Sequence, residues 1–309
     1  MPLVFMDWLF IAYCVYLPPL TVFYILQVIL IVRDRKAFKS SFYTLFLIGA
    51  VNDCFVQLAV VIYRIEVTPI VNSFLSDVPD NIITRLFYAG TFVFPTAQEI
   101  LNIAIALNRL TSVVLFRVHN QVWAYCIPIT IVLMIIVPCS YCWVLLVVPF
   151  TFSPVPYYTS TLYFASPNIT GYPGYNHNTI ALYVLVLTPL TCFGFYLVTF
   201  YYLRRSTNAL VIGERRRLFY IGLFLAVIDI PFAALEVFMS TNRTAEVLTI
   251  GIPQVPWLYD CKVYAPPVLL FLFNGEMRRR IRRVFVRSGK ESSGQNSSKN
   301  VRVMEVRAT

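Results

Sequence analysis

Five ionisable side chains inside long apolar segments are the residues of this chain best placed to do chemistry. They are Asp53, Glu99, Asp229, Asp260 and Lys262. A charged side chain is costly to bury in hydrocarbon, and residues of this kind usually mark a ligand site, an ion pathway or a switch. We therefore treat these five as the candidate ligand-binding or switch residues.

The depth of these residues predicts that several of them meet. Asp53 lies about twelve residues from the basic start of its segment, which at 1.5 Å per residue is a depth of about 18 Å. Glu99, Asp229 and Lys262 lie at similar depths in their own segments, and Asp260 lies half a turn from Lys262. We expect Lys262 to pair with a buried carboxylate. Glu99, Asp53 and Asp229 all stay open as its partner, because the rotation of the helices is unknown.

Three interpretations of this buried charge stay open. The pair acts as polar glue between helices, as a switch whose pairing changes with ligand or protonation, or as part of an ion pathway. Prolines near the charges give either static curvature or hinges that suit a switch, because each removes a helical hydrogen bond and kinks or loosens its helix. Pro231 lies two residues from Asp229, and Pro266 and Pro267 follow Lys262 in the same segment.

Seven apolar segments carry these residues, and each is long enough to cross a membrane as a helix. Hydrophobic residues make up 58% of the chain, against about 45–50% in soluble proteins. The sequence therefore predicts an all-α, polytopic membrane protein with a bundle of seven transmembrane helices. The predicted spans are residues 9–32, 41–63, 86–107, 122–148, 179–203, 218–240 and 250–273.

The distribution of positive charge predicts the orientation of the bundle. All but four of the 25 Lys and Arg residues lie in the first, third and fifth connections and in the tail after the seventh segment. Because cytoplasmic loops are rich in Lys and Arg, these connections face the cytoplasm and the N-terminus lies outside. The net charge of +10 thus reflects membrane topology and gives no reason to expect nucleic acid as a partner.

The connection over residues 151–178 is expected on the outer side and is not a helix candidate, because prolines and glycines interrupt it. Its tyrosines form either an interfacial aromatic belt or a lid over a pocket. Asn168 in this connection and Asn242 in the last outer loop are glycosylation sequons, N-x-S/T.

The segment after the seventh span predicts a short cytoplasmic amphipathic helix over residues 275–287. Met277, Ile281 and Val284 fall on one face, and arginines occupy the rest, as in helices that lie on an anionic leaflet. The polar, Ser-rich residues 288–309 are expected to be a disordered tail. The chain is thus one receptor-like domain, residues 1–287, and a tail.

Several short motifs carry a family resemblance. They are Leu107-Asn108-Arg109-Leu110-Thr111-Ser112 with His119 and Trp123 after it, Leu17-Pro18-Pro19, Ser41-Phe42-Tyr43, and Pro266-Pro267-Val268-Leu269-Leu270. With these motifs the chain resembles the nematode serpentine chemoreceptors of the class gamma superfamily, over about residues 9–287. The resemblance implies a plasma-membrane receptor of sensory neurons and their cilia that detects a small molecule and acts through a heterotrimeric G protein.

The resemblance also suggests which residues face the G protein. Arg109 matches the arginine of the Asp-Arg-Tyr motif in the wider rhodopsin-like class, although Asn108 and Leu110 differ from that motif. The Asn-Pro-x-x-Tyr motif and the usual outer cysteine pair are absent from the sequence. We expect a basic cytoplasmic cleft for the G protein, formed by Arg109, Arg204, Arg205, Arg215, Arg216 and Arg217.

Other classes of function are kept as alternatives. A transporter or ligand-gated ion channel could use a charged site at the midplane, although no internal repeat typical of transporters is evident. A membrane scaffold without a ligand is a third class. An enzyme is not expected, since His119 and His177 are the only histidines and lie on opposite predicted faces. The sequence indicates no metal site and no cofactor.

Overall fold

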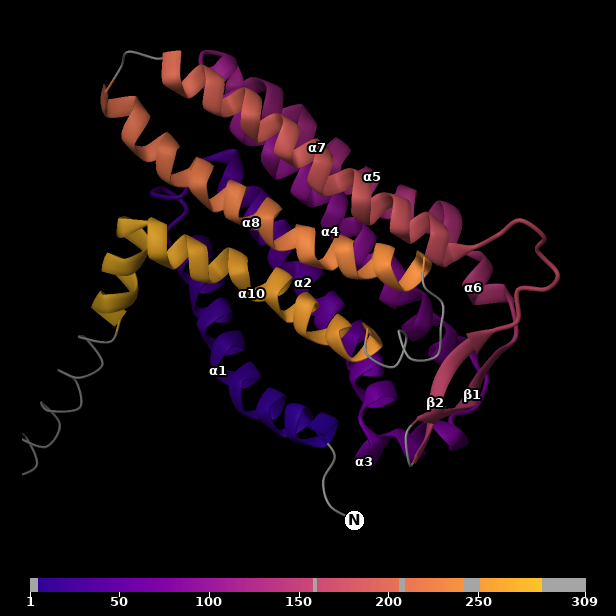
Figure 1. The fold of residues 1–309 in the computed structure, drawn as a ribbon. Helices are drawn as coiled ribbons and strands as arrows, with labels where there is room; N and C mark the ends of the chain where they lie inside the picture. Colours follow the sequence, from indigo (N-terminus) through magenta and orange to yellow (C-terminus); the bar gives the residue numbers. More distant parts are fainter. Residues whose placement is uncertain (1–4, 158–159, 206–208, 242–250, 285–309) are drawn as a thin grey trace, which may run out of the picture.

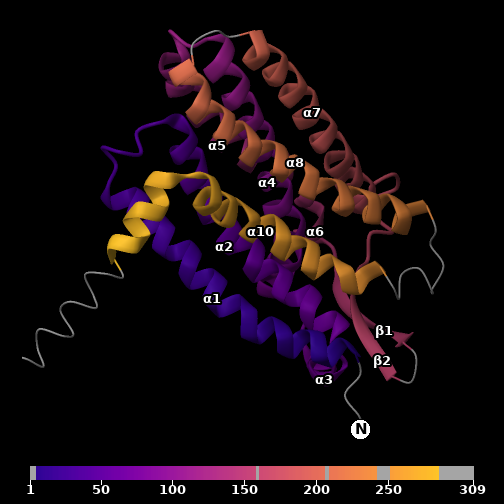
Figure 2. The same ribbon diagram turned by 60° about the vertical axis from the view of Figure 1, so that its left-hand side comes forward.

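The computed structural model describes residues 5–157, 160–205, 209–241 and 251–284. Seven long helices dominate it and lie side by side in one bundle (Figures 1 and 2). The predicted seven-helix architecture is confirmed. The helices are α1 (Phe5–Arg33), α2 (Ser41–Val67), α4 (Ile82–Val114), α5 (His119–Cys142), α7 (His177–Arg205), α8 (Ala209–Thr241) and α10 (Val255–Phe273).

Six of these helices, all but α10, are long and apolar enough to cross a membrane. Helix α10 has 19 residues, or about 28 Å at 1.5 Å per residue, close to the thickness of a hydrocarbon core. It carries two charged residues, Asp260 and Lys262, in its first half. Its start also differs from the predicted residue 250: it begins at Val255 after a 3-10 turn, η2 (Ile252–Gln254), with Pro256 in its first turn, a position that suits proline.

Helix α4 occupies the middle of the bundle and packs against α2, α5 and α7. Its long central stretch is accordingly the most buried of the membrane-length helices. Large apolar side chains on the outer helices face outward instead, such as Val15, Tyr125 and Leu190 at 71%, 76% and 65% exposure. A soluble monomer rarely exposes so much apolar surface. This surface is the part of the fold that lipid covers.

The fourth predicted span is interrupted in the structure. Helix α5 ends at Cys142, and a separate turn, α6 (Val144–Val147), follows Trp143. Pro138 lies in the last turns of α5, where its missing N–H weakens the hydrogen-bond ladder. The expectation of one continuous helix over residues 122–148 is therefore wrong at this point.

The connection after α6 forms an antiparallel β-hairpin that the sequence did not predict. Strand β1 (Phe150–Tyr157) pairs with β2 (Ser160–Pro167), in a register from Phe150↔Pro167 to Tyr157↔Ser160. The expectation that this connection is not helical is confirmed for its described residues up to the start of α7. The prolines of this connection gave no indication of strands, because proline is depleted in sheets and tolerated mainly on edge strands.

The hairpin is attached to the corner that follows α2, formed by α3 (Pro69–Asn72) and η1 (Ser73–Asp77). The side-chain amide of Asn72 donates to the Tyr163 carbonyl (3.1 Å) and accepts from the Tyr163 N–H (2.6 Å). Oε1 of Glu66 accepts from the Ala165 N–H at 2.9 Å. An isolated two-stranded hairpin is marginal in water, so these bonds hold it in place. We call the end of the bundle with the hairpin and the starts of α1 and α10 the hairpin end (Figure 1).

After α10 the chain turns at Asn274 and continues as a helix through residues 275–284. Oδ1 of Asn274 accepts from the backbone N–H groups of Glu276 (3.0 Å) and Met277 (3.1 Å), which is a helix N-cap. This agrees with the start of the predicted amphipathic helix. Residues 285–287 and the tail 288–309 lie outside the described residues.

The apolar face of this short helix packs on the bundle. Met277 and Ile281 are buried, at 0% and 6% exposure. Arg280 forms ion pairs with Asp34 and with Glu276 (2.7 Å for the latter). Hydrogen bonds from the guanidinium groups of Arg279 and Arg280 lower the pKa of Glu276 below its ordinary value, so this carboxylate is ionised at neutral pH.

Candidate functional site

The predicted buried ion pair lies where α4, α8 and α10 meet. Nζ of Lys262 forms an ion pair with Glu99 and lies 3.1 Å from Oδ1 of Asp229. All three side chains are buried, with 3%, 1% and 6% exposure. Asn102 donates from Nδ2 to Oδ2 of Asp229 at 3.3 Å. The structure thus gives Lys262 two carboxylate partners from two different helices.

Asp53 is the candidate that forms no ion pair with Lys262 in the part of the chain that the structure describes. Its carboxylate accepts from the Tyr24 hydroxyl at 2.7 Å and from Nε2 of Gln98 at 2.8 Å. Asp53 is buried, at 4% exposure, and neutral donors surround it. Asp53 lies at about the level of Gln98 and Glu99 along the bundle, as its position in the segment predicts. Its side chain, however, faces α1 and α4.

The cluster of Lys262, Glu99 and Asp229 holds three helices at one point. One ammonium faces two carboxylates, and Oε2 of Glu99 is buried without a hydrogen-bond partner among the described residues. Removing one partner from a buried ion pair leaves an uncompensated charge and is strongly destabilising. The contacts of the Lys262 ammonium therefore depend on how α8 and α10 lie relative to α4.

A second buried ion pair lies at the hairpin end and was missed in the sequence. Nη2 of Arg64 contacts Oδ1 of Asp260, with side chains 4% and 6% exposed. The Tyr16 hydroxyl donates to the other oxygen of Asp260, and Nε2 of Gln57 donates to Oδ1 at 3.1 Å. Arg64 was missed because the second span was predicted to end at residue 63, whereas α2 continues to Val67 and carries Arg64 inside the bundle.

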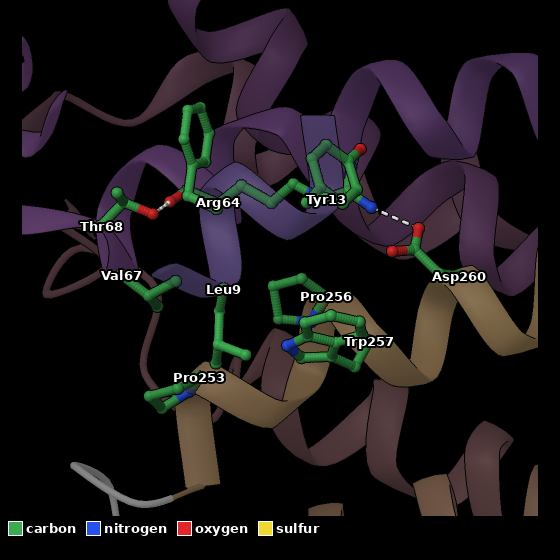
Figure 3. A pocket seen from close by; sticks show the side chains of 10 residues that line it. Leu9, Tyr13, Arg64, Val67, Thr68, Pro253, Pro256, Trp257 and Asp260 are labelled. Atoms are coloured by element: carbon green, nitrogen blue, oxygen red, sulfur yellow. Dashed lines mark hydrogen bonds and ion pairs between the residues drawn. The ribbon is translucent and has the colours of Figure 1, made fainter. Parts of the chain in front are cut away.

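Beside this second pair lies a cleft between α1, the end of α2 and the start of α10. Its space is about 300 Å³, counting the open mouth. Leu9, Tyr13, Trp257 and Pro256 are among its apolar lining, with Arg64 and Asp260 as the charged groups (Figure 3). Most of this space is open to the surroundings, and the enclosed part is about 30 Å³.

The opposite end of the bundle carries the predicted G-protein-facing arginines. Arg109 is 6% exposed, and its guanidinium lies 3.8 Å from the centre of the Phe42 ring. Arg204 and Arg205 are exposed, over the rings of Phe200 and Tyr201. Arg215, Arg216 and Arg217 lie in α8, but their side chains fall outside the described part of the structure. Arg109 faces inward here, so its predicted contact with a G protein requires movement of the helices around it.

The profile of the Srg family chemoreceptor matches residues 10–281 of the sequence. The chain belongs to the Srg chemoreceptor family. One curated relative, serpentine receptor class gamma-2 of Caenorhabditis elegans, is 23% identical over 291 residues, which cover 90% of this chain and 85% of the relative. The family resemblance is thereby confirmed, and with it a multi-pass membrane protein of a serpentine receptor family rather than of an enzyme family.

In this Srg-family chain the residues of the third-span motif form one polar network. Nδ2 of Asn108 donates to Oγ of Ser41 at 2.6 Å, and that hydroxyl lies 3.1 Å from Nε2 of His119. Thr111 lies 3.3 Å from the other ring nitrogen of His119 and accepts from the Trp123 indole at 2.7 Å. The motif residues therefore tie α2, α4 and α5 together next to Arg109.

The remaining candidate residues of the Srg-family chain lie elsewhere. Asn168 is exposed after β2, and its Oδ1 accepts from the Thr170 hydroxyl at 2.7 Å. Its glycosylation stays a prediction. Asn242 lies outside the described residues. Within the ranges that the structure describes, no three His, Cys, Asp or Glu side chains gather as metal ligands.

Proposed function

We propose that this chain is a chemosensory receptor of the plasma membrane that detects a small molecule and signals through a heterotrimeric G protein. The observation that carries the proposal is the cluster of Lys262, Glu99 and Asp229, which holds α4, α8 and α10 together inside a chain of the Srg family. A receptor needs two arrangements of its helices with different affinities for ligand and partner. This cluster supplies a discrete contact that differs between two such arrangements.

In the proposed mechanism the ligand enters the cleft at the hairpin end and acts on α10. Asp260, which lines the cleft, lies two residues before Lys262 on the same helix. Pro266 and Pro267 follow within α10, and they leave carbonyl groups of the preceding turn without helical donors. A ligand that shifts the start of α10 therefore moves Lys262 relative to Asp229 on α8.

At the other end of the bundle, the same movement opens the packing around Arg109. The guanidinium leaves the Phe42 ring and, with Arg204, Arg205 and residues 215–217, forms a basic surface for the G protein. The hairpin end then faces the outside, as the Lys and Arg distribution predicts, and the basic end faces the cytoplasm. Sensory-neuron cilia are the proposed location.

Co-expression of the full chain with heterotrimeric G proteins in cultured cells tests this function. Energy transfer between labelled Gα and Gβγ is recorded while small volatile and water-soluble compounds are applied, and the same compounds are applied to Arg109→Ala. We expect a compound to separate the subunits with the natural chain and not with Arg109→Ala at equal surface expression.

The opposing result is a ligand-evoked current from purified protein in a lipid bilayer without any G protein. That outcome would replace the receptor by the ion-channel alternative. A G-protein response that Arg109→Ala retains in full would leave the receptor in place but remove Arg109 from its mechanism.

A further inference from the structure

Two residues that line the cleft have a buried polar atom without a hydrogen-bond partner among the described residues: Tyr13 at its hydroxyl and Arg64 at Nε. The charged one is Arg64. It is 3% exposed and lines the cleft. Its Nη2 is engaged by Asp260, and its Nη1 donates to Oε1 of Gln57 at 3.3 Å. Its Nε–H is buried and has no hydrogen-bond partner among the described residues. A buried donor without a hydrogen bond costs free energy, so the cleft favours a ligand that supplies an acceptor.

The acid of the cleft, by contrast, is already satisfied. Asp260 receives donors from Tyr16, Gln57 and Arg64 on its two oxygens. An ammonium ligand at Asp260 would have to displace one of these donors and would lie near the Arg64 guanidinium. The unpartnered polar groups of the cleft are the Nε–H of Arg64, which only donates, and the Tyr13 hydroxyl, which can donate or accept. The positive charge of Arg64 favours an anionic head group over an amine.

The walls of the cleft fit an apolar body behind such a head. The Tyr13 ring lies 3.6 Å from the Arg64 guanidinium carbon, and the Trp257 ring stacks on Tyr16 with centroids 5.5 Å apart. Figure 3 shows Leu9, Pro256 and Trp257 on the side of the cleft across from Arg64. These side chains offer aliphatic and aromatic surface and no further charge.

We propose that this cleft binds the carboxylate of a small amphiphilic acid on Arg64, with the apolar part of the acid against Trp257 and Pro256. The assignment rests on the proposed receptor function and names the chemical class of its ligand. It also gives binding a mechanical consequence. A carboxylate at Arg64 competes with Asp260 for the guanidinium and repels it, so Asp260 is pushed away and carries the start of α10 with it.

Quenching of tryptophan fluorescence tests the assignment on the purified full chain in lipid nanodiscs. The probes are ω-bromo-octanoate, ω-bromo-octanol and ω-bromo-octylamine, whose bromine quenches a tryptophan that it touches. We expect saturable quenching by the acid at concentrations about tenfold to hundredfold lower than by the alcohol or the amine, the range for one charge-assisted hydrogen bond. Trp257→Phe should remove the saturable part, and Trp143→Phe, at the other side of the hairpin end, should keep it.

A paired substitution separates a binding role of Arg64 from a structural one. Arg64→Gln together with Asp260→Asn removes both charges and leaves amides that can still pair, so the fold is retained. It should abolish the preference for the acid while the alcohol quenches as before. The matched control is Arg85→Gln with Asp80→Asn, which removes the half-exposed ion pair of Arg85 with Asp80 (2.7 Å) and should change nothing.

Two results would overturn the assignment: no saturable quenching by any probe, or equal quenching by acid and amine. Both leave the receptor function in place and remove the cleft as its ligand site, since a receptor could take its ligand elsewhere. Conversely, selective binding of the acid by a chain that never activates a G protein would keep the assignment and refute the function.

Discussion

Nζ of Lys262 on α10 lies 3.1 Å from Oδ1 of Asp229 on α8. Glu99 completes the contact from α4. If the contact of Lys262 with Asp229 restrains α8, weakening it shifts the equilibrium between the two helix arrangements. Coupling energies of this kind are typically about 1–3 kcal/mol.

Asp229→Asn is therefore expected to raise signalling without ligand. The substitution keeps the shape of the side chain and leaves one ammonium facing one carboxylate, so the fold should be retained while α8 loses its charge contact. We expect a severalfold rise in basal G-protein activation, measured by nucleotide exchange on purified G protein. Asp80→Asn, which makes the same change in an ion pair far from the cluster, serves as control. Equal basal activity in the natural chain and in Asp229→Asn would leave the cluster with a structural role only.

The sequence predicts how far along its helix each of these charged residues lies, but it does not predict toward which neighbouring helix the side chain points. Hydrophobic length and a rise of 1.5 Å per residue place Asp53, Glu99, Asp229 and Lys262 at one level. Which of them meet depends on how each helix is rotated, and rotation is decided by packing across helices that are apolar all round. Asp53 thus turns to Tyr24 and Gln98, which no periodicity in its segment indicates.

Arg64 and the hairpin show two other limits. Arg64 lies just past the apolar run of its span, and only the continuation of α2 to Val67 brings it into the bundle and against Asp260. The strands β1 and β2 contain three prolines, Pro154, Pro156 and Pro167, so their own sequence does not indicate strands. Their attachment to the bundle comes from Asn72 and Glu66, about ninety to a hundred residues earlier in the chain. The position of Arg64 and the placement of the hairpin both depend on contacts between residues far apart in the sequence.

Lys262→Met is expected to destabilise the folded chain. It leaves Glu99 and Asp229 buried without their cation, and breaking a buried pair in this way costs about 3–5 kcal/mol. A lower midpoint of thermal unfolding in detergent measures this loss. Adding Glu99→Gln and Asp229→Asn to Lys262→Met removes the uncompensated charge and should restore much of the stability. A single Lys262→Met as stable as the natural chain would contradict the ion pairs of the structure.

Asn72→Ala is expected to release the hairpin from the bundle. The Asn72 amide makes two bonds to Tyr163 and donates to the Glu66 carbonyl at 2.8 Å, and each such bond contributes about 1 kcal/mol. Hydrogen exchange at residues 160–167 should become at least tenfold faster, while exchange in the middle of α4 stays slow. Asn168→Gln, an exposed change in the same connection, should leave the exchange as it is. Unchanged protection of β2 in Asn72→Ala would show that strand pairing alone holds the hairpin.

Asn168 tests the orientation on which the proposed function depends. The side chain is exposed beside the hairpin, and glycans are added only to sequons that reach the lumenal side of the secretory pathway, which becomes the outside. We expect the full chain from animal cells to migrate faster on a gel after treatment with a glycan-removing amidase. Asn168→Gln should show less of that shift, and Asn168→Gln with Asn242→Gln should show none. If instead the natural chain carries no glycan and a tag after residue 309 is labelled in unpermeabilised cells, the hairpin end is cytoplasmic. The cleft beside Arg64 would then face the cytoplasm, where it could not receive a ligand from outside.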